Sequence, residues 1–189
     1  MHERAVTAIV DGNEDLATRV RERDDEVDRL FGMVSRHYQR ALSDLQEIDQ
    51  LGIDRPTIAD YYTIARQLER VGDHAEKIAA IALRLDAPSE EIVNDIDTVA
   101  REAREIVKDA SSVLIGGTDV DMAYRALDVR DSLTGELDKL DRRLYDGDSP
   151  DRYLLGLFLD SVRRTAEYGG NIAETMIQAA AREGELSDR

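Results

Sequence analysis

The segment LERVGDHAEKIA, residues 68–79, decides the fold of this chain. Its apolar and small residues recur every three or four positions, at Leu68, Gly72, Ala75 and Ile78. This spacing places them on one face of an α-helix, because a helix turns once every 3.6 residues. Two carboxylates, Glu69 and Asp73, lie four residues apart beside that face, where like charges repel. The segment therefore predicts a helix with an acidic edge that needs a cation, a basic partner or water.

The same helical spacing continues in both directions along the chain. Glycine and proline divide it into segments: Pro56 suits the first turn of a helix, and Ser89 suits a helix N-cap. We expect a short helix before Gly12 and longer ones over 16–48, 56–85, 90–115, from the glycines at 116–117 to 145, and from 150 to 181, with a turn at 146–150. The alternating pattern of a half-buried strand does not occur. The sequence therefore predicts an all-α protein.

The chain also repeats itself. A shift of 94 residues aligns LERVGDHAEKIA with VRRTAEYGGNIA, and a shift of 106 aligns EDLATRV with VDMAYRA. Each repeat then holds three helices, which short loops make antiparallel neighbours. We predict two tandem antiparallel three-helix bundles, at residues 1–86 and 89–183, followed by a flexible tail at 184–189.

The two repeats differ in the length of their first helix. The helix before Gly116 has about 26 residues, whereas its counterpart before Gly12 has only about 10. We expect the first bundle to be short at its N-terminal side: either this repeat is genuinely short, or, as we favour, some 15 residues of helix belong upstream of Met1 in a longer protein. An uncovered apolar groove usually becomes an interface, so we also expect a homodimer that buries this end.

The composition limits the partners of the protein. A net charge of -16 argues against direct nucleic-acid binding, because phosphate contacts need clustered Lys and Arg. The 25 Asp and 16 Glu, set against three Lys and 22 Arg, are typical of halophile proteins, in which surface acid serves solvation. Without cysteine there are no disulfides, thiolate metal sites or thiol catalysis. No run of about 18 apolar residues and no signal-peptide core is present, so we expect a cytoplasmic protein that does not insert into membranes.

Two acidic pairs are the candidate functional residues. Asp24 and Asp28 flank the apolar stripe of one helix, and Glu69 and Asp73 flank that of the next. If the two antiparallel helices present these pairs to each other, four carboxylates share a small volume and can bind a divalent or trivalent cation. Spacing alone does not distinguish such a site from a solvated acidic face, because four-residue acid pairs are common in this composition.

The residues that form these pairs also carry a family resemblance. The segments DDEVDRL, IARQLERVGDHAEKIA and RRTAEYGGNIAE resemble the signature segments of the PhoU family of phosphate-uptake regulators. The resemblance implies a helical bundle that binds metal ions through E/D-x-x-x-D motifs, here Asp24, Asp28, Glu69 and Asp73. The ion, with oxygen ligands, is then Fe, Mn, Zn, Mg or Ca. It further implies a negative regulator that docks onto a phosphate ABC transporter ATPase or a phosphate-signalling protein.

The second repeat departs from this pattern. Arg130 takes the place of Asp24, Thr134 that of Asp28, and Arg163 that of Glu69, whereas Glu167 keeps the acid of Asp73. Arginines at these positions repel a cation, and we expect Arg130 to pair with Asp131 and Arg163 with Glu167. The sequence predicts one competent site, in the first repeat.

Two classes of function remain open beside the regulator. One is a metal-dependent enzyme of phosphate chemistry, and the other is a helical accessory or oligomerisation module of a longer transcriptional regulator. An enzyme needs a tuned acid or base beside the metal and an enclosing pocket, and the sequence offers neither. His74 follows Asp73 but points about 100° away from it, which favours a structural histidine. We predict that the protein is not an enzyme.

Overall fold

The computed structural model describes residues 1–86, 88–116, 120–147 and 150–184. This part of the chain holds eight α-helices and no strand, so the predicted all-α class is confirmed. The helices are α1 (His2–Val10), α2 (Glu14–Glu22), α3 (Asp24–Ser43), α4 (Leu45–Leu51), α5 (Arg55–Ala82), α6 (Glu90–Gly116), α7 (Val120–Asp146) and α8 (Arg152–Glu183).

Local side-chain chemistry sets where the long helices begin. The Asp54 carboxylate accepts a hydrogen bond from the Thr57 N–H at 2.9 Å, and Pro56 lies in the first turn of α5. The Ser89 hydroxyl oxygen accepts from the Ile92 N–H at 3.4 Å, just before α6 begins. Each cap satisfies a backbone N–H that has no partner within the helix. The predicted helix starts at Pro56 and Ser89 are confirmed.

The single helix predicted over residues 16–48 is wrong, because the chain breaks it twice. At Arg23 the backbone N–H bonds to Val20 O, three residues back, and this tight turn separates α2 from α3. At Asp44 the backbone is extended, with φ -124° and ψ 117°, which ends α3. The Asp44 carboxylate then accepts from the Gln46 N–H at 2.9 Å and starts α4. Apolar spacing reports neither break, because both are decided by local turn and cap geometry.

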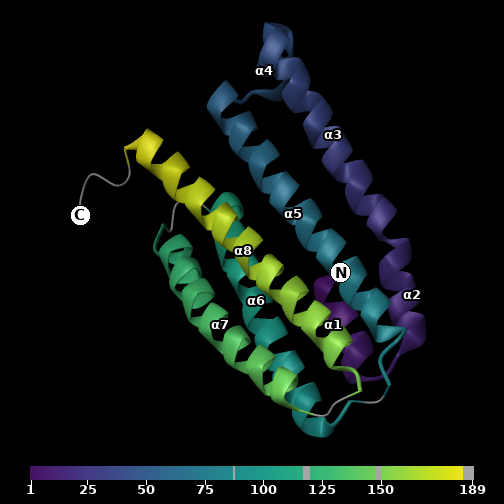
Figure 1. The fold of residues 1–189 in the computed structure, drawn as a ribbon. Helices are drawn as coiled ribbons and strands as arrows, with labels where there is room; N and C mark the ends of the chain where they lie inside the picture. Colours follow the sequence, from purple (N-terminus) through teal and green to yellow (C-terminus); the bar gives the residue numbers. More distant parts are fainter. Residues whose placement is uncertain (87, 117–119, 148–149, 185–189) are drawn as a thin grey trace.

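The helices pack as two connected groups (Figure 1). Helices α6, α7 and α8 contact one another pairwise, and α5 lies along α8. Helix α1 packs against both α5 and α6, whereas α3 packs along α5 on the side away from α6, α7 and α8. One continuous core joins residues of both groups, among them Ile78 and Phe158, each fully buried. The predicted boundary between repeats, at residues 86–89, stays a prediction.

Helix α1 is far shorter than its counterpart α6, with nine residues against 27. It rises about 13 Å, whereas α5 rises about 42 Å at 1.5 Å per residue. The far ends of α3 and α5 therefore extend beyond α1 as an arm, with α4 at its tip (Figure 1), and α8 follows α5 as far as the ion pair between Arg182 and Asp60. Tyr62 of α5 stacks on Phe31 and Tyr38 of α3, with ring centroids 5.8 and 4.4 Å apart, and this holds the arm together.

An apolar strip remains exposed on this arm. Its members are Leu30 and Met33 of α3 and Tyr61 and Leu68 of α5, with exposed fractions between 40% and 61%. Leu30 and Met33 are one helical turn apart, and Tyr61 and Leu68 are two turns apart, so each pair lies on one face of its helix. A packed bundle buries such side chains, whereas in the described part of the chain these four remain exposed.

Some predicted boundaries lie partly outside the described residues. This holds for Gly117 in the predicted stop, for residues 148–149 of the predicted turn and for residues 185–189 of the predicted tail. Among the residues that the structure describes, no helix is long and apolar enough to cross a membrane.

Candidate metal centre

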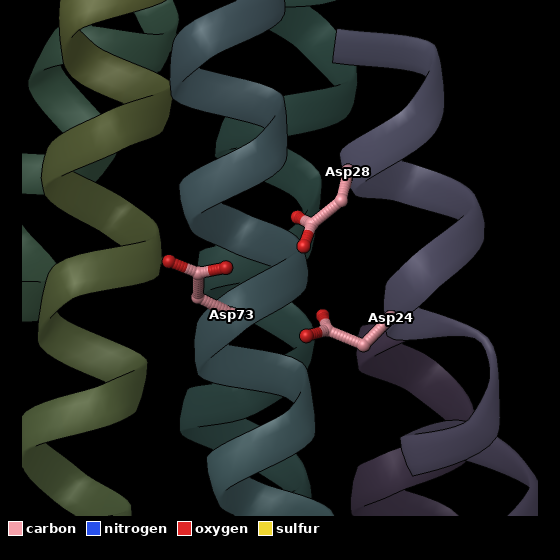
Figure 2. Close-up of side chains that lie close together, drawn as sticks. All are labelled: Asp24, Asp28 and Asp73. Atoms are coloured by element: carbon pink, nitrogen blue, oxygen red, sulfur yellow. The ribbon is translucent and has the colours of Figure 1, made fainter. Parts of the chain in front are cut away.

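Three carboxylates meet between α3 and α5 (Figure 2). Asp24 and Asp28 project from successive turns of α3, and Asp73 projects from the middle of α5. One carboxylate oxygen from each residue lies within 4.8 Å of the others. Asp24 and Asp73 are half-buried and Asp28 is exposed, so the carboxylate cluster opens to solvent on one side. We call Asp24, Asp28 and Asp73 the acidic cluster.

Close packing of the two helices brings these side chains together. Gly72, the residue before Asp73, faces Val27 of α3, and a Cβ at Gly72 would lie 3.2 Å from Val27 Cγ1. That distance is shorter than an ordinary van der Waals contact, so a larger residue at this position would require Val27 to shift by a few tenths of an ångström. Asp24 and Asp28 are four residues apart and so share a face of α3. The sequence thus sets both the helix spacing and the carboxylate positions.

The electrostatics of the acidic cluster are unfavourable without a cation. Burial, followed by the charge of Asp28, raises the pKa of Asp24 and also that of Asp73. The Asp24 Oδ1 atom is buried and has no hydrogen-bond partner. Within the described part of the chain, no Arg, Lys or His nitrogen lies within 4.0 Å of these three carboxylates, in contrast to many other acids of the chain. The charges of Lys77 and Arg70 partly offset the rise in the pKa of Asp73, but among the described residues no basic side chain forms an ion pair with the cluster.

The fourth predicted ligand, Glu69, lies beside the acidic cluster and is not one of its three members. Burial, followed by the charges of Asp73 and Asp28, raises the pKa of Glu69. Sequence reasoning missed Glu76, whose charge contributes to the raised pKa of both Asp24 and Asp73. The signal was present, because Glu76 follows Asp73 by three residues and so lies on the same face of α5.

The donor set fits a hard cation. Carboxylate oxygens are the ligands of Mg²⁺, Ca²⁺, Mn²⁺ and iron, and the cluster offers neither thiolate nor imidazole. A cation placed among Asp24, Asp28 and Asp73 would neutralise their mutual repulsion and would satisfy the buried Asp24 Oδ1. Three carboxylates leave further coordination positions for water or another ligand.

Sequence comparison agrees with the helical architecture. Residues 1–82 match the family model described as PhoU domain. The first part of this chain is therefore similar to the PhoU domain. The match includes Asp24, Asp28, Glu69 and Asp73, the four candidate ligands. No curated protein matches the sequence at a significant level.

Two solved structures share the fold of this chain. PhoU from Pseudomonas aeruginosa has a TM-score of 0.84 at 24% identity, over 96% of this chain and 88% of the other. The phosphate transport system regulatory protein PhoU from Streptococcus pneumoniae has a TM-score of 0.79 at 18% identity, over 100% of this chain and 89% of the other. Both similarities extend through α6, α7 and α8, beyond the residues that match the family model.

Arginine occupies the equivalent position of the second repeat. The Arg130 guanidinium donates to Asp131 Oδ1 at 2.8 Å and to Glu174 Oε1 at 3.3 Å, so the predicted pair with Asp131 is confirmed. It lies directly over Gly170 of α8, where a Cβ would be 2.7 Å from the Arg130 side chain. The guanidinium of Arg130 thus lies between α7 and α8, at the position where the first repeat gathers carboxylates.

The predicted pair between Arg163 and Glu167 is wrong. Arg163 of α8 donates to Asp138 Oδ1 of α7 at 2.9 Å, and Glu167 pairs with Arg164 at 2.8 Å. Residues 163 and 167 share a face of α8, but the neighbouring helix α7 offers Arg163 an acid across the interface. Tertiary packing therefore replaced a pairing that local spacing suggested.

His74 and a cavity at the ends of α7 and α8 take no part in the acidic cluster. His74 is 7% exposed, its ring lies 5.7 Å from that of Tyr168 on α8, and burial lowers its pKa to about 4. It is a packed, neutral side chain between α5 and α8. A cavity of about 710 Å³ lies between the ends of α7 and α8, lined in part by Tyr145 and Tyr153, and no residue of the acidic cluster contributes to it.

Proposed function

We propose that this protein is a non-enzymatic regulator of phosphate transport that binds a metal ion in the acidic cluster. The observation that carries the metal proposal is the approach of three carboxylate oxygens within 4.8 Å, without a basic partner among the described residues. The regulatory role is supported by the match of residues 1–82 to the PhoU domain and by the similarity in fold to the phosphate transport system regulatory protein PhoU from Streptococcus pneumoniae. The protein acts in the cytoplasm and lowers phosphate uptake when phosphate is plentiful.

A cation in the acidic cluster would act on the structure of the arm. The cation would connect the start of α3 to α5, next to the break at Arg23 that separates α2 from α3. Because α3 packs along α5 and touches little else in the fold, the cation would set how firmly α3 is held. Asp24 and Asp28 bind the ion from α3, and Asp73 binds it from α5. Glu69 is a further candidate ligand beside them.

The apolar strip is the surface proposed for docking. Leu30, Met33, Tyr61 and Leu68 are exposed on the two helices that the acidic cluster joins, so metal binding and docking share one structural unit. Its occupant in the regulator is a phosphate transporter ATPase or a phosphate-signalling protein, and between copies of this chain the same strip supports a homodimer. The cluster lies outside the 710 Å³ cavity and is open to solvent, which favours a structural metal over a catalytic one.

Phosphate uptake in cells of the source organism tests this function. Deleting the gene should raise the uptake of radiolabelled phosphate in phosphate-rich medium, and the wild-type gene should restore low uptake. An Asp73→Asn variant should fail to restore it, whereas Asp128→Asn, which removes the same charge from an exposed position of α7, should restore it fully. Unchanged uptake after deletion would exclude the regulatory role, and restoration by Asp73→Asn would exclude a role of the metal in it.

A further inference from the structure

The two repeats differ in how far their first helix covers the other helices of the repeat. Helix α6 has 27 residues and packs against both α7 and α8, whereas α1 has nine. The difference of about 18 residues corresponds to about 27 Å of helix. In the described part of the chain, α3 and α5 therefore extend about this far beyond the helix that begins their repeat (Figure 1).

Equivalent apolar positions on α5 and α8 show the effect of this difference on burial. The shift of 94 residues places Leu68 on Val162 and, within the same unbroken helices, Tyr61 on Leu155. Val162 and Leu155 are 0% and 1% exposed in the bundle of α6, α7 and α8, whereas Leu68 and Tyr61 are each 40% exposed. Leu68 and Tyr61 thus occupy positions that a complete three-helix bundle buries.

The positions on α3 that adjoin the same groove are more apolar than their equivalents on α7. The shift of 106 residues places Leu30 on Glu136 and Met33 on Lys139. Glu136 and Lys139 form part of the polar rim where α7 meets α6, whereas Leu30 and Met33 are 61% and 50% exposed. Apolar side chains at rim positions favour an occupant whose apolar face reaches across them.

The charges on α3 indicate the chemistry of the occupant. In the second repeat, Arg143 of α7 pairs with an acid of α6, Asp95, at 2.5 Å. In a chain of net charge -16, residues 29–43 of α3 contain no acid, and Arg36 and Arg40 lie three and seven positions after Met33, on the same flank of the helix. Both arginines are exposed, and no acid among the described residues forms an ion pair with Arg36. This flank is complementary to a negatively charged partner.

We propose that the apolar strip binds an acidic amphipathic helix of a partner protein, placed along α3 and α5 as α6 lies along α7 and α8. The apolar face of this helix covers the strip, and its acidic flank faces Arg36 and Arg40. An amphipathic helix in an apolar groove is a common mode of peptide recognition. This inference rests on the proposed docking role of the strip and names the chemistry of the partner, and it needs no cation in the acidic cluster.

The probe for this proposal is a fluorescein-labelled peptide with the sequence of residues 90–106, EEIVNDIDTVAREAREI, taken from α6. It carries six acids against two arginines, and Ile96, Val99 and Ile106 of its apolar face are buried in the second bundle. Fluorescence polarisation of the peptide with the full chain should show saturable binding. The same peptide with Ile96→Asp and Val99→Asp is the control and should not bind, because its apolar face is broken.

Variants of the full chain locate the binding surface. Leu68→Asp should weaken peptide binding about tenfold or more, whereas Val129→Asp on α7, at a side chain of nearly equal exposure, should leave it unchanged. Arg36→Glu should weaken binding about three- to tenfold, and this loss should shrink as salt is added. Arg125→Glu, which makes the same charge change at an exposed position of α7, should have a smaller effect. Circular dichroism of each variant confirms that the helices are intact.

Each outcome supports or overturns the proposal. No saturable binding up to about 1 mM peptide, or an equal loss in Leu68→Asp and Val129→Asp, would overturn it. If the peptide leaves intact a dimer that Leu68→Asp separates in light scattering, a second copy is the occupant and the partner helix is excluded. Peptide binding at the strip with unchanged phosphate uptake after gene deletion would support the groove and exclude the regulatory role, whereas raised uptake without peptide binding would keep the regulator and overturn the groove.

Discussion

Removing one carboxylate from the acidic cluster should stabilise the metal-free protein. Two unit charges 4.8 Å apart repel by about 0.9 kcal/mol in water and by about 3.5 kcal/mol at an effective dielectric constant of 20. The cluster is partly exposed, so values near the lower figure apply. Asp73 lies close to both Asp24 and Asp28, and Asp73→Asn should therefore raise the free energy of unfolding by about 1–2 kcal/mol. Asp73 is the best position for this test, because it lies mid-helix and caps no helix end.

The assay is thermal unfolding by circular dichroism at low salt with a chelator present. A gain of about 1–2 kcal/mol corresponds to a rise in Tm of about 2–8 °C for a domain of this size. Salt should shrink the difference, because screening shortens the reach of exposed charges. The pKa values of Asp24 and Asp73 are raised in the folded state, so the wild type gains stability as pH falls toward their unfolded values. The difference from Asp73→Asn should vanish in the same range.

An exposed acid provides the control. Asp128→Asn on α7 removes the same charge from a protein of net charge -16 without touching the acidic cluster. If Asp73→Asn left Tm unchanged, raised it no more than Asp128→Asn, or lowered it, the carboxylates would not repel as argued and the cluster would be a solvated acidic face.

Three further predictions concern packing, protonation and assembly. Gly169→Ala should lower the free energy of unfolding by about 1–3 kcal/mol, since the new Cβ would lie 3.0 Å from a backbone nitrogen of α6. Gly156→Ala in the same helix has open space around it and should raise the free energy of unfolding by about 0.5–1 kcal/mol. Equal effects of the two substitutions in urea denaturation would contradict the close packing of Gly169 against α6. His2 is 6% exposed and burial lowers its pKa to about 3, so the unfolded chain binds the extra proton and stability falls as pH drops from about 6.5 toward 3. Replacing His2 by Leu should therefore flatten the pH dependence of the unfolding free energy by about 2–3 kcal/mol at pH 4.5, and an unchanged slope in denaturant titrations would show that His2 is not the group responsible. Leu30→Asp should convert a homodimer into a monomer in light scattering, whereas a wild type that is already monomeric would rule out the apolar strip as a dimer interface.

The sequence predicted the helices and the main partners in the candidate site because both follow from periodicity. Asp24, Asp28 and Asp73 lie on helix faces that the apolar stripes define, and packing those stripes together leaves the carboxylates facing each other. Whether a given acid joins the cluster depends on the offset between α3 and α5, which periodicity does not fix. For this reason the predicted ligand Glu69 is not one of the three carboxylates of the cluster, and the sequence does not predict the effect of Glu76 on Asp73.

Local geometry and cross-helix choice set the remaining differences. The break at Arg23 is a single tight turn between two stretches of the same apolar spacing, so no change in pattern marks it. Arg163 forms its ion pair with Asp138 on α7 and not with Glu167 on its own helix, because an arginine side chain is long enough to span a helix interface as well as one helical turn. Both outcomes depend on how neighbouring helices are placed, and a single sequence constrains that only indirectly.

The metal content of the protein purified without chelator tests the central claim most directly. Plasma mass spectrometry of the wild type, Asp73→Asn and Glu167→Gln compares the acidic cluster with the equivalent position of the second repeat, where Glu167 already pairs with Arg164. We expect bound metal in the wild type, a clear loss in Asp73→Asn and little change in Glu167→Gln. A wild type without bound metal that also takes up none on dialysis, or an equal loss in both variants, would contradict a metal centre confined to the first repeat.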